Sequence, residues 1–286
     1  MSARRGTTGC GTTARARSGR AAARAVPVAT AVGLLLTACA GPGTGAPAGT
    51  ASGAPTGSAS SRAPLTGQLV VFAAASLQQT FTALGDRLMA QNPSLHIIFN
   101  FGASSTLAQQ LEQGAPADVF ASANPATMKA ASAVTDRPVT FAHNSLEIVV
   151  PAGNPGHVTG LADFAKPQLK IALCAVEVPC GSAAATAFAA AGVTPAPDTY
   201  EKDVTATLTK AVLGEVDAAL VYRTDVRSAG DKVQGIDFPQ ASAARNDYPI
   251  ATVAGARNHA AAQAFVDLVL SAQGQKVLTD AGFDAA

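Results

Sequence analysis

Several motifs on which common enzyme classes depend are missing from this chain. A P-loop, a Gly-x-Gly-x-x-Gly fingerprint and a Gly-x-Ser-x-Gly elbow are absent, so an NTPase, a dinucleotide enzyme or an α/β-hydrolase lacks support. The four histidines (His96, His143, His157 and His259) do not have metal-ligand spacing. Tryptophan is absent, and only 14% of the 286 residues are charged. An apolar share of 48% nevertheless predicts a folded α/β protein over most of the length.

Residues 1–39 have the features of a bacterial export signal. They contain six arginines and no acidic residue, and the arginines precede a short apolar run at residues 25–39. That run is shorter than the roughly 20 residues that span a bilayer. It ends in Leu36-Thr37-Ala38-Cys39, which resembles the lipobox of bacterial lipoproteins. We therefore expect a lipoprotein signal peptide with lipidation at Cys39; an ordinary signal with a chance cysteine is the alternative.

Residues 40–67 lack the side chains from which a core could be built. They are mostly glycine, proline, alanine, serine and threonine, which predicts a flexible linker. A lipid anchor followed by a linker implies an extracytoplasmic location for the folded part, anchored to the cell membrane. Beyond residue 39, 14 basic residues stand against 19 acidic ones, a net charge of −5, so a nucleic-acid partner is not expected.

Two cysteines remain in the folded part if Cys10 is removed with the signal and Cys39 carries lipid. Cys174 and Cys180 form an even pair in an oxidising compartment, which favours a local disulfide. Their spacing is not a common metal-binding pattern, and it is not the Cys-x-x-Cys of thiol-redox proteins. Two free thiols are the alternative to the disulfide.

From residue 68 onward, strand patterns alternate with helical patterns. Apolar runs predict strands at 68–74, 95–102, 117–123, 144–153, 169–174, 217–222 and 248–255. Helical spacing predicts helices at 77–91, 105–114, 160–165, 182–192 and 203–216, and closing helices within 260–283. This alternation predicts mostly parallel sheets covered on both faces, and the number of strands favours two lobes.

Small residues and hydroxyls recur where predicted strands give way to helices. Ser76 follows three alanines and Ser104 follows Gly-Ala, while Cys180 and Val204 stand at two later helix starts. In open α/β sheets such turns gather at the carboxyl ends of the strands, and helix N-termini offer free N–H groups to an anion. For Ser76, a capping box with Gln79 is the simpler alternative.

Five segments together carry a family resemblance. VFAAASL, GASSTLAQQLEQGAPADVFASA, VPCGSAA, DVTATL and AALVY resemble the periplasmic molybdate-binding proteins of ABC transporters, in that family's order, over about residues 68–284. The resemblance implies a two-lobed periplasmic-binding-protein fold of type II, with each lobe a mostly parallel sheet flanked by helices. It also implies a tetrahedral oxyanion ligand held by two serines, main-chain N–H groups and one tyrosine hydroxyl, with no cofactor and no catalysis.

Carried over to this chain, the resemblance implies five ligand-binding residues: Ser76, Ser104, Cys180, Val204 and Tyr222. The metal of molybdate would be bound as its oxyanion, with no direct protein ligand. Cys180 stands where the family has alanine, so a side chain tied to Cys174 could reshape that wall of the site. Without the family, Tyr222 reads more simply as a core tyrosine.

A site built from N–H and O–H donors prefers certain ligands. Molybdate, tungstate and sulfate are fully deprotonated near neutrality, whereas hydrogen phosphate carries a proton that needs an acceptor. Capture of molybdate and tungstate is therefore the expected function. A binder of sulfate or another tetrahedral oxyanion is one alternative, and an extracellular serine hydrolase using Ser76 is the alternative from another class.

The resemblance also implies how the chain is divided. Residues 68–144 with 249–286 would form lobe 1, and residues 145–248 would form lobe 2. Closure of the lobes around the oxyanion would produce a shape that an ABC permease in the membrane recognises. We expect a monomer that delivers the ion to this permease.

Overall fold

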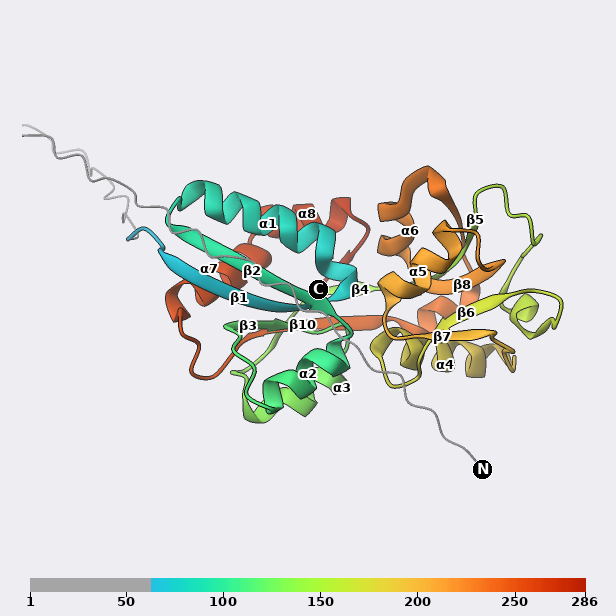
Figure 1. Cartoon of the computed structure of the whole chain (residues 1–286), viewed down its shortest axis with the longest axis horizontal. Coiled ribbons are helices and arrows are strands. Elements are labelled where there is room, and N and C mark those ends of the chain that lie inside the picture. Colours follow the sequence, from blue (N-terminus) through green and yellow to red (C-terminus); the bar gives the residue numbers. More distant parts are fainter. Residues whose placement is uncertain (1–62) are drawn as a thin grey trace, which may run out of the picture. The chain divides into compact units, whose positions relative to one another are not determined.

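The computed structural model describes residues 63–286, which alternate strands with helices (Figure 1). The predicted signal peptide, the lipidation site Cys39 and most of the predicted linker lie outside the described residues. Residues 65–67, at the end of the predicted linker, are hydrogen-bonded to the folded part or belong to its first strand, which corrects the expectation of a flexible segment up to residue 67. Gly67 begins the first strand, the Leu65 N–H donates to Asn92 Oδ1 at 2.9 Å, and Asn258 Nδ2 donates to the Thr66 carbonyl at 2.8 Å.

The strands are β1 Gly67–Ala74, β2 Leu95–Gly102, β3 Val119–Ala121, β4 Val139–Asn144, β5 Leu146–Pro151, β6 Ile171–Cys174, β7 Thr199–Glu201, β8 Ala218–Tyr222, β9 Val233–Ile236, β10 Asn246–Thr252 and β11 Asp284–Ala285. The α-helices are α1 Gln78–Gln91, α2 Ser104–Glu112, α3 Pro125–Ala130, α4 Pro179–Ala191, α5 Val204–Val212, α6 Arg223–Ala229, α7 His259–Leu270 and α8 Ala272–Asp280. Short 3-10 helices occupy Ala75–Leu77, Ala131–Ala133, Leu161–Ala165, Gly230–Lys232 and Pro239–Ala244.

Six strands form the first sheet, in the order β11-β4-β10-β3-β1-β2. Successive residues of a strand face opposite sides of the sheet, so each face has its own core. Val71 and Val119 pack in the core beneath α1, α7 and α8, whereas their neighbours Phe72 and Phe120 pack beneath α2 and α3. Helices thus cover both faces of this sheet (Figure 1), and we call the sheet with these helices lobe 1.

Five strands form the second sheet, in the order β7-β6-β8-β5-β9. Helix α4 covers one face, and α5 and α6 cover the other (Figure 1); the sheet with these helices is lobe 2. In both sheets parallel and antiparallel pairs occur together: β1 pairs in parallel with β2 and β3, and β6 with β7 and β8. Strands β4, β5, β9, β10 and β11 pair antiparallel. The α/β class is confirmed, and the expectation of mostly parallel sheets is corrected to mixed ones.

The chain crosses between the two sheets twice. It leaves lobe 1 at Ser145, between the end of β4 and the start of β5, and it returns before β10. Strand β10 pairs with β4 from Asn246 onward, so residues 246–248 belong to the first sheet and the predicted end of lobe 2 at residue 248 is three residues too late.

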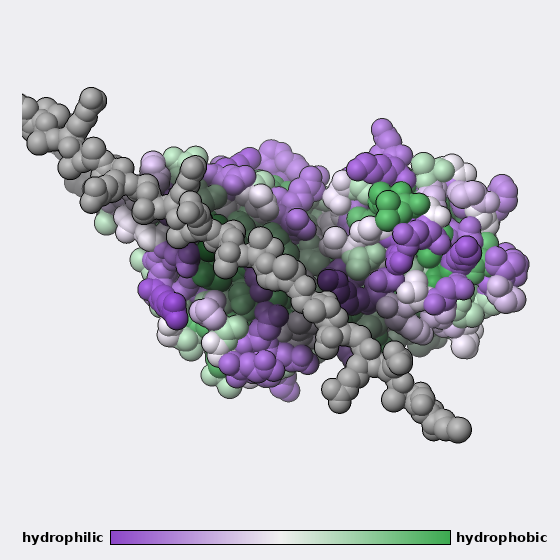
Figure 2. All heavy atoms as spheres, in the orientation of Figure 1, coloured by the Kyte–Doolittle hydropathy of each residue, from purple (hydrophilic) through white to green (hydrophobic). Residues whose placement is uncertain are grey.

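On the face seen in Figure 2, hydrophilic residues gather over the outer surfaces of α1 and α2, and a hydrophobic group is exposed on lobe 2. Across residues 63–286, the helices are all too short or too polar to traverse a lipid bilayer.

Candidate functional site

A small pocket lies where both lobes present the carboxyl ends of their strands. Lobe 1 contributes residues 74–76 at the end of β1, residues 102–104 at the end of β2, and Ala123. Lobe 2 contributes residues 178–180 and 203–204, at the starts of α4 and α5, together with Tyr222 at the end of β8. The pocket has a volume of about 20 Å³, counted as the space that the centre of a water molecule can occupy. One water needs roughly 10–15 Å³ by this measure, so the pocket suits a small compact ligand.

The structure brings together the five residues that the sequence predicts as a ligand set. Ser76 and Ser104 line the pocket from lobe 1, and Cys180, Val204 and Tyr222 line it from lobe 2. Ser104 and Tyr222 are each only 1% exposed. A ligand in this pocket would therefore touch both lobes and little bulk water.

Three helices begin at the pocket wall. The first residues of α2, α4 and α5 all line it, and the first N–H groups of a helix have no carbonyl partner within that helix. Their partial positive charge favours an anion. Lysine, arginine and histidine do not occur among the described residues that line the pocket, and Asp203 is the charged residue there. Its carboxylate accepts the Ala206 N–H at 2.8 Å, so it caps α5.

The two serines bond to groups other than their own helix ends. Ser104 Oγ accepts the Ala123 N–H at 3.0 Å. Ser76 Oγ lies 3.0 Å from the phenol oxygen of Tyr248. The capping-box interpretation of Ser76 is wrong, because Leu77 is the N-cap residue of α1 and no side chain caps that helix.

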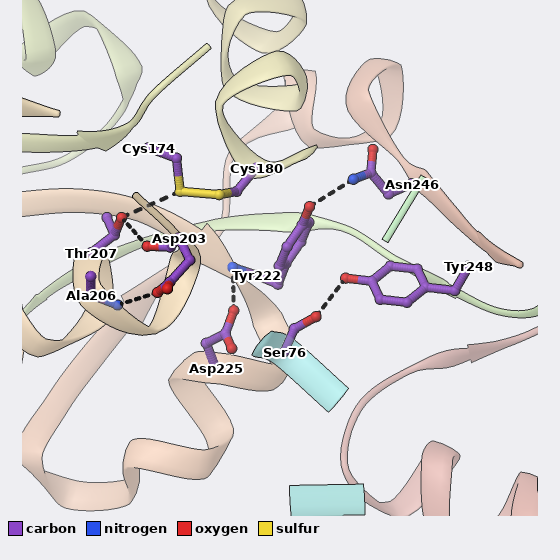
Figure 3. Close-up of a disulfide and its surroundings, with 10 residues drawn as sticks. All are labelled: Ser76, Cys174, Cys180, Asp203, Ala206, Thr207, Tyr222, Asp225, Asn246 and Tyr248. Atoms are coloured by element: carbon purple, nitrogen blue, oxygen red, sulfur yellow. Dashed lines mark hydrogen bonds between the residues drawn. A yellow bond between two sulfur atoms is a disulfide. The ribbon is translucent and has the colours of Figure 1, made fainter. Parts of the chain in front are cut away.

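Two buried tyrosines lie at the pocket (Figure 3): Tyr222 lines it, and Tyr248 lies behind Ser76. Asn246 Nδ2 donates to the phenol oxygen of Tyr222 at 2.7 Å, and the two tyrosine rings meet edge to face with centroids 6.0 Å apart. Burial raises the pKa of Tyr222 and of Tyr248 well above the usual value for a phenol. Both phenols therefore stay protonated at neutral pH and remain able to donate a hydrogen bond.

Sequence reasoning missed Tyr248 and Asn246. Tyr248 is 172 residues from Ser76 and Asn246 is 24 residues from Tyr222, and no local motif marks either of them. Tyr248 is fully buried in the strand predicted at 248–255, where a buried tyrosine reads as an ordinary core residue. Only the pairing of strands reveals what these side chains touch.

Cys174 and Cys180 form a disulfide with their Cα atoms 5.8 Å apart, which confirms the predicted bridge (Figure 3). The bridge joins the end of β6 to the first turn of α4. Cys174 Sγ also lies 3.3 Å from Thr207 Oγ1 in α5. The disulfide therefore connects three elements of the lobe 2 wall, and it does so through a residue that lines the pocket.

A buried carboxyl group lies directly behind Tyr222. Asp225 Oδ2 accepts the Tyr222 backbone N–H at 3.0 Å (Figure 3). Burial raises the pKa of Asp225 to about 7, the nearby Asp203 charge adds to this rise, and the Tyr222 N–H opposes it. Close to neutral pH this group therefore exchanges between its acid and carboxylate forms.

The residues around Ser76 do not resemble a hydrolytic centre. Its hydrogen-bond partner is a phenol with a raised pKa, whereas an activated serine nucleophile needs an adjacent base. His143, one of the four histidines, instead pairs with Asp247 at 2.6 Å. Within residues 63–286, histidine, cysteine, aspartate and glutamate side chains do not gather in threes that could hold a metal ion.

Comparison with known proteins agrees with this geometry. The family model of the bacterial extracellular solute-binding proteins matches residues 69–284. The molybdate-binding protein ModA of Mycobacterium tuberculosis H37Rv is 42% identical over 218 residues, which cover 75% of this chain and 84% of that protein. ModA of Escherichia coli K12 is 31% identical over 240 residues, covering 76% and 89%.

A solved structure shows the same architecture. The periplasmic molybdate-binding protein of Azotobacter vinelandii superposes with a TM-score of 0.65 at 18% identity, over 76% of this chain and 99% of that chain. This likeness confirms the expected two-lobed periplasmic-binding-protein fold. The chain belongs to the family of bacterial extracellular solute-binding proteins.

Proposed function

We propose that this protein is the substrate-binding component of an ABC importer, which captures molybdate, and tungstate with it, outside the cell membrane. One observation carries the proposal: a single small pocket joins hydroxyl groups and helix N-termini of both lobes, and no cationic side chain lines it in the described part of the chain. The names of the two relatives point to the same ligand.

Neutral donors can hold a doubly charged ion in such a pocket. The donors would be the hydroxyls of Ser76, Ser104 and Tyr222 and the backbone N–H groups of Cys180 and Val204. A hydrogen bond to a charged group contributes about 1.5–3 kcal/mol. Several such bonds, together with the dipoles of three helices, offset the cost of removing the dianion from water.

The same donors select the protonation state of the ligand. Hydrogen phosphate carries a proton that must be accepted by the site. Asp203 is the carboxylate in the described lining, and it is engaged with the Ala206 N–H at 2.8 Å. The pocket is therefore suited to an oxyanion that carries no proton. Sulfate shares that property, so it is the main competitor of molybdate and tungstate.

Transport follows from closure of the lobes. Only the closed arrangement brings the lobe 1 serines and the lobe 2 residues to one ligand, so the ligand stabilises that arrangement. A membrane permease would recognise the closed shape and receive the ion.

The family places the protein outside the cytoplasm and makes the solute a ligand rather than a cofactor. We further propose that lipid on Cys39 holds the protein at the membrane and that it works as a monomer. Mass spectrometry of the mature protein would show the lipid, and its loss in Cys39→Ala would assign it.

A thermal-shift panel of oxyanions on residues 63–286 tests the proposed ligand. We expect molybdate and tungstate at micromolar concentration to raise the unfolding temperature, with sulfate weaker and phosphate weakest. A shift with sulfate and none with molybdate would establish the sulfate binder instead. Labelling of Ser76 by a serine-reactive phosphonate would establish the hydrolase.

A further inference from the structure

Two hydroxyl groups of the pocket have an N–H donor behind them. Ser104 Oγ accepts the Ala123 N–H at 3.0 Å, and Tyr222 Oη accepts Asn246 Nδ2 at 2.7 Å. A hydroxyl group has one proton and two acceptor lone pairs. When an N–H group occupies a lone pair, the hydroxyl proton must point elsewhere. Ser104 and Tyr222 both line the pocket. For the Tyr222 proton the Tyr248 phenol is a second acceptor, but a dianion in the pocket is a stronger acceptor than a neutral phenol.

We propose that Asn246 is a specificity-determining positioning residue: by donating to the phenol oxygen of Tyr222, it directs the phenol proton into the pocket. The proposal rests on the proposed function, in which Tyr222 donates to a fully deprotonated oxyanion. Asn246 is not among the residues that line the pocket, so it acts through Tyr222. Tyr222 is 1% exposed, and water therefore cannot replace Asn246 freely as the donor.

The backbone holds Asn246 at one of the two crossings between the lobes. It is the first residue of β10, and in the antiparallel pair of β10 with β4 it lies opposite Asn144, the last residue before the other crossing. Both asparagines reach into lobe 2. Asn246 donates to Tyr222 at 2.7 Å, and Asn144 Nδ2 donates to Thr224 Oγ1 at 2.8 Å. The direction of the phenol proton therefore depends on how the lobes are joined.

Ser76 stands at the end of a similar but weaker chain of bonds. Its Oγ lies 3.0 Å from Tyr248 Oη, and Asn144 Nδ2 lies 3.5 Å from that same phenol oxygen. Donation from Asn144 to Tyr248 and from Tyr248 to Ser76 would leave the serine proton for the ligand. The Asn144 contact at 3.5 Å is weaker than the Asn246 contact at 2.7 Å, so Asn246 is the residue to vary.

The opposite arrangement has a predictable effect on selectivity. A carboxylate at position 246 would accept the phenol proton, and a lone pair of Tyr222 would then face the pocket. A lone pair repels molybdate or sulfate, but it can accept the proton of hydrogen phosphate. The side chain at position 246 would thus determine which protonation state of a tetrahedral ligand is favoured.

A double-mutant cycle separates this orienting effect from the added charge. Isothermal titration calorimetry would measure molybdate and phosphate binding to the wild type, Asn246→Asp, Tyr222→Phe and the double variant. With Tyr222 present, we expect Asn246→Asp to weaken molybdate binding at least tenfold and to lower the ratio of molybdate to phosphate affinity. In the Tyr222→Phe background only the added negative charge of Asn246→Asp remains. The loss of molybdate affinity should therefore be several-fold smaller, and the affinity for phosphate should not rise.

Asn246→Leu provides the matched variant without charge. It removes the donor, and it should weaken molybdate binding severalfold with Tyr222 present and by less than twofold with Tyr222→Phe. Thermal unfolding without ligand checks that each variant folds. If Asn246→Asp does not fold, the Asn246→Leu cycle makes the same comparison.

Different results would overturn the role of Asn246 and the proposed function. The wild type could bind molybdate while the substitutions at position 246 change the affinity by the same factor with Tyr222 and with Tyr222→Phe. In that case this inference is wrong and the proposed function stands. If the wild type binds sulfate instead, the molybdate assignment is wrong and the same cycle with sulfate decides the role of Asn246. If it binds neither anion, both proposals are overturned.

Discussion

Asn144 and Asn246 lie directly opposite each other in the antiparallel pair of β4 and β10. The two segments that cross between the lobes therefore run side by side rather than at opposite edges of the molecule. Two adjacent crossings act as one hinge, because small backbone changes at a pair of neighbouring segments can rotate lobe 2 as a unit. This arrangement supports a site in which each lobe supplies half of the donors.

Replacing Ser104 tests whether the buried serine binds the ligand. Ser104→Ala removes a charge-assisted hydrogen bond, and we expect molybdate affinity to fall by about 10- to 100-fold, which corresponds to about 1.5–3 kcal/mol. Calorimetry measures the change. Ser105→Ala is the matched control, because Ser105 lines a neighbouring hollow rather than this pocket. A larger loss with Ser105→Ala than with Ser104→Ala would contradict the assignment.

Removing the disulfide tests the support of the lobe 2 wall. The bridge closes a short loop with a sequence separation of 6 residues. Its loss in the double variant Cys174→Ser/Cys180→Ser should lower the free energy of unfolding by about 2 kcal/mol. For a domain of this size the unfolding temperature should fall by roughly 4–8 °C. Differential scanning calorimetry with and without reductant measures this, and the double variant should not respond to reductant.

The raised pKa of Asp225 predicts that the stability of the folded protein depends on pH. Its pKa of about 7 in the folded protein lies above the usual 3.8 for aspartate. Between these values the folded state retains a proton that the unfolded state has lost, so the contribution of this group to stability falls as the pH rises from about 4 to 7.

Asp225→Asn removes this titration. Relative to the wild type, the variant should gain about 3 kcal/mol of stability between pH 5 and pH 8, because two pH units lie between pH 5 and the folded pKa of about 7 and each contributes about 1.4 kcal/mol. Urea unfolding at the two pH values measures the gain, and comparing the two proteins cancels the other titrating groups. An identical difference between variant and wild type at both pH values would show that Asp225 does not titrate in this range.

Gly181 predicts a steric limit at the start of α4. A Cβ atom there would clash with the Ala175 carbonyl oxygen and would lie 2.8 Å from the Cys174 carbonyl oxygen. Gly181→Ala should therefore displace the first turn of α4, lower the free energy of unfolding by about 1–3 kcal/mol and weaken anion binding.

Ser182→Ala is the control for Gly181→Ala, since Ser182 is exposed on the next position of the same helix. Thermal unfolding and calorimetry on both variants give the comparison. If Gly181→Ala and Ser182→Ala have equal free energies of unfolding and equal anion affinities, the first turn of α4 can accommodate the added Cβ atom, and the prediction is wrong.

Much of lobe 1 was predictable because its strands and helices have strong periodic patterns. Leu77, Phe81, Leu84 and Leu88 recur at helical spacing, and all four are buried, Leu77 just before α1 and the other three on its inner face. Strand β4 was missed because its apolar pattern is weak: Val139 is 47% exposed, and the strand ends in His143 and Asn144. The pairing was mispredicted because a strand pattern does not reveal the direction of its neighbour. Strand β10 reaches the first sheet from lobe 2, and this return makes its pairs antiparallel.

The pocket residues were predictable from short motifs at strand ends, whereas the groups behind them were not. Tyr222 and Ser76 each stand in a recognisable segment, but Asn246 and Tyr248 become their partners only through the folding of distant strands. A single sequence carries no local trace of such a contact. Long-range hydrogen bonds of this kind are therefore what the structure adds to the site.

Strand β1 would receive any force that pulls on the chain N-terminal to it. The chain enters the described body beside Leu65 and Thr66, which are bonded to Asn92 and Asn258, and β1 then runs eight residues from Gly67 to Ala74 at the pocket. Eight strand residues span roughly 26 Å, so the start of β1 lies about that far from the pocket. The last strand, β11, is also part of the first sheet. Tension on the N-terminal segment would thus be borne by lobe 1, and lobe 2 would stay free to swing.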